Sequence, residues 1–547
     1  MASLRRVVAS HRARWSRVRV VGVTSLTCLG MTLAACGGGD SDTGTGANTG
    51  GGSGKPTETL TWAANVNCFE GLDLGTGVPG GRDLLLTYEP LIRFTPQGEL
   101  EPGLATSWEV APGNKSITLQ LREDARFSDG TPVTAEAVKT WLDYRNTIAG
   151  PFDGTLGRIE KVEVLGRHEV RITLVKPNPV FPRALSPAVG SNWGYVANPK
   201  AVAKAKANPR SDVLKKESHG AGAYVLVPSE TVPGDHCTYV PNRHYFDQSR
   251  IRWAKVVTKN IPDSNTVLAA LKTGQVDVGE GDSSTAPAAK AADLQVVYSQ
   301  GRLQGITFFD KGGRLNPALA DVRVRQALNY AVDRETITRS LFGPDAQPTS
   351  NPNPTSDGDD PETRDYYPYD PERARRLLAD AGYPNGFTLR MSAPGAWIGP
   401  FKTTPLAQAV AGDLAKVGVR VELSSSANIT ADNADLASRR FEARSAIFGT
   451  NPTWVWYPLA MQPGGYLADQ HGFVDPVTQR LWEQASVATE EEAAPLWKEL
   501  VNRTIEQAYF IGVLSPGMYT YFGDRVGPVD AVQDGAQSPL DWAPAEG

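Results

Sequence analysis

Residue patterns that carry catalysis are scarce in this 547-residue chain. The sequence contains no G-x-S-x-G nucleophile elbow, no H-E-x-x-H zinc motif and no C-x-x-C pair. Residues 75–80 spell G-x-G-x-x-G, yet no predicted strand ends directly before them and Pro79 disturbs the turn that a dinucleotide site needs. The pattern therefore predicts a glycine-rich loop. Because no catalytic motif is recognised, the chain is not expected to be an enzyme.

Metal-ligating residue types are present, but their spacing is unsuitable. His236, Cys237 and His244 match no closed tetrahedral pattern. The acidic residues between 357 and 360 lack the spaced ligands and terminal glutamate of a calcium loop, which favours a solvated acidic turn. We expect no metal and no cofactor.

Aromatic residues concentrate in segments with loop character. Residues 448–458 hold four aromatics among turn formers, and Trp397 lies on a turn after the predicted strand 387–391. Alternation in this segment would place Trp454 and Trp456 on one face, which could equally be a core face. The residues predicted to bind a ligand are Asn67, Phe69, Trp397, Asn451, Thr453, Trp454 and Trp456.

Strands and helices alternate from Pro56 onward, which predicts an α/β fold. Asp370-Pro371 forms an N-cap and first helical position before an apolar stripe that ends at Gly382. A second helix is expected from 404 to 417, followed by the alternating strand 419–423. The irregular residues 343–369 are too long for a plain connection and are expected to wrap a surface or border a site.

The N-terminal 35 residues form a predicted signal peptide. Six arginines precede the uncharged stretch 20–35, which is too short and too rich in Thr for a spanning helix. The stretch ends Leu33-Ala34-Ala35-Cys36, which resembles a bacterial lipobox in which Cys36 would be diacylated. Residues 36–56 would then be a lipidated cysteine and a flexible Gly-rich tether.

Charge and cysteine content agree with export. Once the six arginines of the leader are set aside, 49 basic residues face 60 acidic ones, so a nucleic-acid partner is not expected. Cys68 and Cys237 are the two cysteines left after processing and lipidation. An oxidising compartment favours a disulfide between them, although spacing alone does not exclude two separate thiols.

Several sequence blocks, spread in order over about 450 residues, resemble family 5 of the extracellular solute-binding proteins. This family of ABC-importer lipoproteins includes oligopeptide-, dipeptide- and nickel-binding proteins. The blocks are Tyr88 to Arg93, Leu100 to Val110, Phe127 to Val138, Gly222 to Leu226, Asp321 to Arg334, and Tyr369 to Pro384.

The resemblance implies a type II periplasmic-binding-protein fold, with two lobes joined by a hinge and a small α/β domain inserted near the N-terminus. Lobe one would comprise residues 57–88, 200–300 and 508–547, the inserted domain residues 89–199, and lobe two residues 301–507. The expected function is capture of a small organic solute, peptide-like or other, and its delivery to an ABC importer permease. The expected state is a monomer anchored to the outer face of the cytoplasmic membrane.

The sequence departs from the family that it resembles at one position that concerns the ligand. Peptide-binding members carry an aspartate in the segment matching 448–458, where it pairs with the ligand's ammonium, whereas this segment has Asn451 and Thr453 and no carboxylate. An unpaired ammonium in a closed cleft is costly, which argues against peptides read by that group. Two other classes stay open: a sensor or chaperone independent of transport, and an exported enzyme on the same fold.

Overall fold

The computed structural model describes most of the chain after residue 57. The described residues are 58–64, 84–95, 99–148, 157–187, 193–208, 211–300, 303–395, 401–427, 429–448, 452–530 and 538–546. The predicted signal peptide, Cys36, the tether, Cys68 and the predicted glycine-rich loop lie outside them. Within the described part, no helix has both the length and the apolar character needed to cross a membrane.

A seven-stranded sheet is assembled from segments far apart in the chain, in the order β12-β19-β11-β1-β10-β9-β8. β1 runs parallel to β10 and β11, and β19 inserts antiparallel between β11 and β12. Its strands are β1 Thr59–Ala64, β8 Tyr224–Leu226, β9 His236–Pro241, β10 Lys255–Asn260, β11 Val278–Gly281, β12 Gln295–Gln300 and β19 Gly517–Phe522.

A six-stranded sheet forms the second lobe, in the order β14-β18-β13-β17-β15-β16. Strands β15, β16 and β17 are parallel to one another. β13 lies between β17 and β18 and is antiparallel to both. The strands are β13 Leu303–Phe308, β14 Gln347–Pro348, β15 Thr388–Pro394, β16 Arg420–Ser426, β17 Ala443–Phe448 and β18 Phe510–Ser515.

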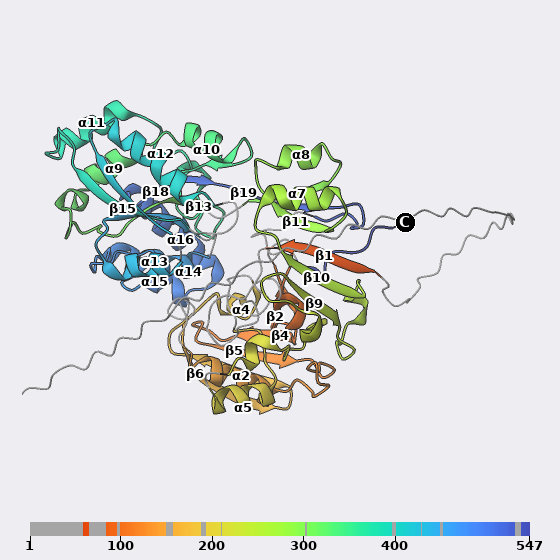
Figure 1. Cartoon of the computed structure of the whole chain (residues 1–547). Helices are drawn as coiled ribbons and strands as arrows, with labels where there is room; N and C mark the ends of the chain where they lie inside the picture. The colour runs from red at the N-terminus through yellow and green to blue at the C-terminus, as the bar shows by residue number, and fades with distance from the viewer. Residues whose placement is uncertain are drawn as a thin grey trace, which may run out of the picture. The chain divides into compact units, whose positions relative to one another are not determined.

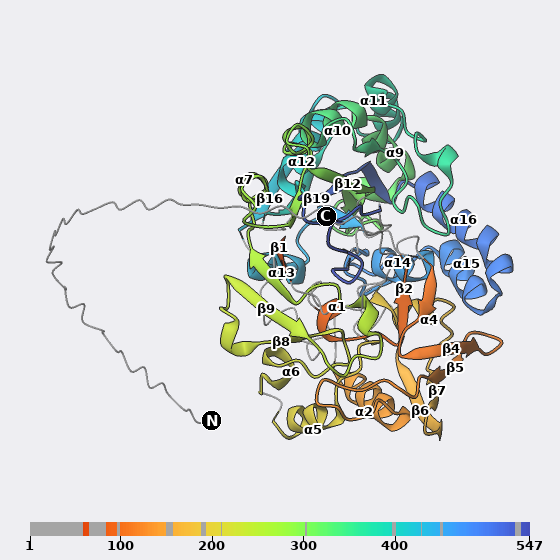
Figure 2. The same ribbon diagram turned by 90° about the vertical axis from the view of Figure 1, so that its right-hand side faces the viewer.

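An antiparallel four-stranded sheet and a two-stranded hairpin lie between β1 and β8 in the sequence. They contain β2 Ile92–Phe94, β3 Leu100–Pro102, β4 Ala105–Val110, β5 Ser116–Leu121, β6 Ile159–Gly166 and β7 Glu169–Leu174. Helices α2 and α5 lie beside this sheet in both views (Figures 1 and 2). This is the region in which the resemblance predicts a small inserted domain.

The helices cover the sheets where the sequence leaves apolar stripes. α12 packs on the six-stranded sheet through Leu406, Val410 and Leu414, which are fully buried. The helices are α1 Leu84–Thr87, α2 Ala135–Arg145, α4 Phe181–Ala184, α5 Pro199–Ala207, α6 Val213–Lys216, α7 Ser264–Lys272, α8 Ala286–Lys290, α9 Val322–Tyr330, α10 Arg334–Phe342, α11 Pro371–Asp380, α12 Thr403–Ala415, α13 Ile429–Ser438, α14 Thr453–Ala460, α15 Pro476–Val487 and α16 Glu490–Glu506.

The predicted α/β class is confirmed, with two large mixed sheets and a small antiparallel sheet. The structure differs from the expected boundaries at two points. α5 packs against α2 beside the four-stranded sheet, although residues from 200 onward are expected in lobe one. β18 pairs with β13 and β14 in the six-stranded sheet, although residues from 508 onward are expected in lobe one. The chain returns to the seven-stranded sheet only at β19.

Candidate ligand cleft at the carboxyl ends of the strands

The two large sheets are joined by two very short connections. Residues 301–302 separate β12 from β13, and Pro516 alone separates β18 from β19. The two connections start side by side in the seven-stranded sheet, where Gln300 pairs with Gly517. In the other sheet Gln304 pairs with Leu514. These adjacent crossings form the hinge of the molecule.

The parallel strands of both sheets end at these crossings. In the seven-stranded sheet Ala64 pairs with Asn260, and β11 ends at Gly281 opposite Tyr519, near the start of β19. In the six-stranded sheet Phe448, the last residue of β17, pairs with Leu303. Ligands of open α/β sheets bind outside the carboxyl ends of the strands, so the segments that follow these strands define the candidate cleft.

The segments predicted to bind ligand are those that follow these strand ends. Asn67 and Phe69 come after β1, Trp397 after β15, and Asn451 between β17 and α14; these four residues lie outside the described part of the chain. These segments therefore begin at the carboxyl ends of the parallel strands, where the candidate cleft lies. The role of the four side chains stays a prediction.

The remaining predicted binding residues lie in α14, and here the expected loop or strand is wrong. Thr453 to Ala460 is a helix, so Trp454 and Trp456 are two residues and about 200° apart on it and cannot share a face. Every residue of α14 is buried. A helix that is apolar all round gives no amphipathic pattern, which is why the sequence did not reveal it.

The two tryptophans of α14 have separate partners. The Trp454 indole stacks on Trp482 with ring centroids 5.7 Å apart, and its Nε1 donates to Ser486 Oγ over 3.0 Å. Trp456 packs against Phe510 of β18, and its buried Nε1 has no hydrogen-bond partner among the described residues. These contacts place both rings in the core of lobe two, and Thr453 is likewise fully buried.

Asp357, expected in a solvated acidic turn, is exposed and also contacts the start of this helix. Asp357 Oδ1 accepts a hydrogen bond from Thr453 N over 2.7 Å, at the start of α14. The surrounding protein desolvates the carboxyl and raises its pKa, although the hydrogen bond opposes this. The loop 343–369 therefore delivers an acidic group beside the segment 448–452, which has none of its own.

The two neighbouring acids are occupied elsewhere. Asp359 pairs with Arg364 at 2.7 Å, and Asp360 accepts from Asn502 and lies 3.1 Å from Lys498. The three carboxylates therefore do not converge on one point. No group of three or more metal-ligating side chains occurs within the described residues.

A buried ion pair links α13 to the start of β17. Arg444 of β17 donates to both carboxylate oxygens of Asp432 of α13, over 2.8 and 2.6 Å, and both residues are buried. Arg444 also donates to Tyr466 Oη, and Ser426, the last residue of β16, donates to Asp432 over 3.4 Å. The pair holds α13 against β17, and Ser426 links it to β16; no local pattern in the sequence predicts this contact.

Cys237 in β9 is buried and disulfide-bonded. Its partner lies outside the described residues. β9 lies beside β10, and β10 pairs with β1, the strand that precedes Cys68 in the sequence.

Two lobes joined by two adjacent short crossings, with the parallel strands of both sheets ending at the crossings, form the arrangement expected of a type II periplasmic-binding-protein fold. A family model for the middle part of bacterial extracellular solute-binding proteins, family 5, matches residues 99–466 of this chain. The chain belongs to that family, whose members are extracytoplasmic binding proteins of ABC importers.

Individual relatives are distant. Heme-binding protein A of Haemophilus influenzae is 28% identical over 393 residues, which are 66% of this chain and 68% of the relative. The periplasmic murein peptide-binding protein MppA of Escherichia coli is 27% identical over 55% of this chain, and less than two thirds of its own length is spanned (58%). A dipeptide-binding protein from Pseudoalteromonas sp. SM9913, solved with Met-Leu, has a TM-score of 0.74 at 20% identity, covering 89% of this chain and all of that one.

Proposed function

We propose that this protein captures a small organic solute outside the cytoplasm and delivers it to an ABC importer permease. The observation that carries the proposal is the convergence of strand ends from both large sheets on two adjacent crossings. Family membership supports the same conclusion. We propose a binding role without catalysis, because the relatives are named for what they bind.

The mechanism follows from the geometry of the crossings. A ligand that contacts segments after β1 and after β15 or β17 touches both lobes only when they are closed. Its differential affinity for the closed form shifts the population toward closure. The permease would then distinguish the loaded from the empty protein by shape.

The ligand class is proposed from the chemistry of the candidate cleft. The relatives are named for ligands as different as heme and a murein peptide, so family membership alone does not select one. The segment 448–458 has no carboxylate, which favours a solute that is not read through a free α-ammonium group. Asn67, Phe69, Trp397 and Asn451 would supply hydrogen bonds and stacking surfaces.

Asp357 is the group that could contradict this proposal. Calorimetric titration with short peptides and their N-acetylated forms tests it, because acetylation removes the ammonium and leaves the rest of the peptide unchanged. We expect no tight binding that depends on the free amine. Tight binding that is lost both on acetylation and in Asp357→Asn, but kept in the exposed control Asp380→Asn, would show that Asp357 reads an ammonium.

Anchoring and the disulfide are further proposals. Cys36 would carry the lipid, residues 1–35 would be removed, and the Gly-rich tether would hold the binding domain at the outer face of the membrane. Cys68 would be the partner of the bonded Cys237. Titration of the denatured mature protein without reductant should find no free thiol, and two reactive thiols would reject this pairing.

A further inference from the structure

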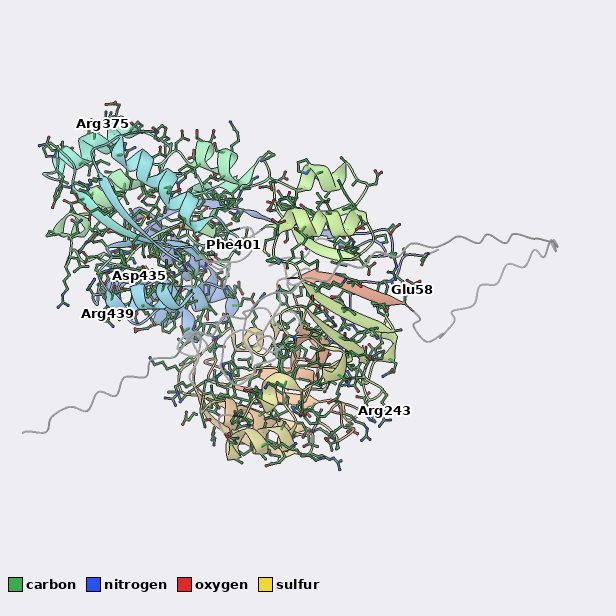
Figure 3. The ribbon with its side chains drawn as sticks, in the orientation of Figure 1. Glu58, Arg243, Arg375, Phe401, Asp435 and Arg439 are labelled. Carbon is green, nitrogen blue, oxygen red and sulfur yellow. The ribbon has the colours of Figure 1, made fainter. Side chains whose placement is uncertain are left out.

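A cavity of about 770 Å³ lies in lobe two, away from the candidate cleft. Its wall is formed by the turn after β13, by the end of α13 and by the loop 463–472. β13 ends at Phe308, which pairs with Ala443 at the start of β17, so this turn lies at the edge of the sheet opposite the crossings. Figure 3 shows Arg439, which lines the cavity, on the far side of this lobe from Phe401, which precedes α12.

The one carboxylate in the cavity wall is already satisfied. Asp469 is 2% exposed, and its Oδ2 accepts from Lys311 N over 2.6 Å. Its Oδ1 accepts from His471 N over 2.7 Å and from Phe473 N over 3.1 Å. Asp469 therefore acts as an internal clamp on the loop, and its lone pairs point into the protein.

The cationic groups in the wall, in contrast, are free. Among the residues that the structure describes, neither Arg314 nor Arg439 forms an ion pair or a side-chain hydrogen bond, and both are exposed. His471 Nε2 is buried and also lacks a partner within the described chain. The wall therefore offers a ligand two exposed guanidinium groups and the side-chain amide of Gln470, whereas His471 Nε2 is buried.

Most of the rest of the lining is apolar or main chain. Leu315, Leu436 and Pro463 contribute aliphatic surface, and the Tyr466 ring is held by its hydrogen bond from Arg444. The loop can form a close wall because Gly465 has no side chain: a Cβ there would meet the Pro458 carbonyl oxygen at 2.2 Å. An apolar floor beside two free arginines suits a molecule with a hydrophobic body and an anionic end.

We propose that this cavity is a second binding site, for a small organic anion that carries a carboxylate or phosphate group on an apolar body. The guanidinium fork matches the oxygens of both anions, and the volume lies in the range of small-molecule sites. The proposal does not depend on the solute bound in the cleft, because the wall comes from lobe two alone.

The test is calorimetric titration of the intact mature protein with benzoate, phenyl phosphate and the neutral analogue benzamide at low ionic strength. We expect at least one anion to bind in the millimolar range or tighter, with benzamide clearly weaker. In Arg314→Gln/Arg439→Gln, affinity for that anion should fall at least about tenfold, since each lost bond is charge-assisted. The better of the two anions identifies the preferred group.

The matched control is Arg376→Gln/Arg480→Gln, which removes the same charge from two exposed arginines outside the cavity. This pair should keep the affinity of the parent protein, and both double variants should keep its melting temperature. The proposal is overturned if neither anion binds, if benzamide binds as tightly, or if the control pair loses as much affinity as the cavity pair.

Discussion

Lys311 carries a buried ammonium group whose pH dependence can be worked out. The side chain is 1% exposed, its Nζ donates to the Phe308 carbonyl oxygen over 2.6 Å, and it lies 5.0 Å from the centroid of the Phe510 ring. Burial lowers its pKa from 10.5 to about 7, with Asp469 opposing and Arg325 adding to the shift. The unfolded chain therefore binds more protons than the folded one between these two values.

The sign of the effect follows from linkage. Where the unfolded state binds more protons, the free energy of unfolding rises with pH, so this group costs stability near neutrality and the cost decreases as pH rises. A full proton is worth about 1.4 kcal/mol per pH unit, and Lys311 is half-protonated near pH 7 in the folded protein. Between pH 7 and pH 9 the stability contributed through Lys311 should therefore increase by about 2 kcal/mol.

The perturbation is Lys311→Met, which keeps the main-chain N–H that Asp469 accepts and removes the ammonium. We expect the variant to be more stable than the parent at pH 7 and to lose about 2 kcal/mol of this advantage by pH 9. Urea unfolding followed by tryptophan fluorescence at several pH values measures the difference, with the exposed Lys290→Met as control. Parallel pH curves for the parent and Lys311→Met would refute the reasoning.

Three further outcomes are expected. Trp454→Ala should lower the free energy of unfolding by about 3 to 5 kcal/mol, because the ring stacks in a packed core, and a melting temperature close to that of the parent would contradict this. Asp432→Ala should cost about 3 to 5 kcal/mol by leaving the Arg444 guanidinium buried without its carboxylate, and Asp432→Ala/Arg444→Met should recover much of the loss in denaturant titrations. Cys36→Ala should release the protein from the membrane fraction, and unchanged retention after that substitution would reject the lipid anchor.

Local signals in the sequence predicted many elements correctly. The helix expected after Asp370 begins at Pro371, and the Asp370 carboxylate accepts from Arg373 N over 2.8 Å. The helix expected from 404 to 417 is α12, and the strand expected over 419–423 is β16. Such features depend on neighbours within a few residues, so spacing and residue type are enough to reveal them.

The contacts around the candidate cleft could not be predicted in this way. Asp357 reaches Thr453 across 96 positions of the chain, and the Asp432–Arg444 pair depends on how α13 returns to β17. α14 escaped detection because burial on all sides removes the periodic pattern by which a surface helix is recognised. Long-range packing, and not local propensity, decides these positions.

The insertion of β19 between β11 and β12 has a consequence for the order of assembly. The lobe that contains the first strand of the chain gains a central strand only from residues 517–522, after the whole second lobe has been passed. Until β19 has formed, β11 and β12 have unpaired strand edges, and such edges can pair with strands of other molecules. Mutations that slow the folding of lobe two should therefore increase aggregation through the incomplete sheet of lobe one.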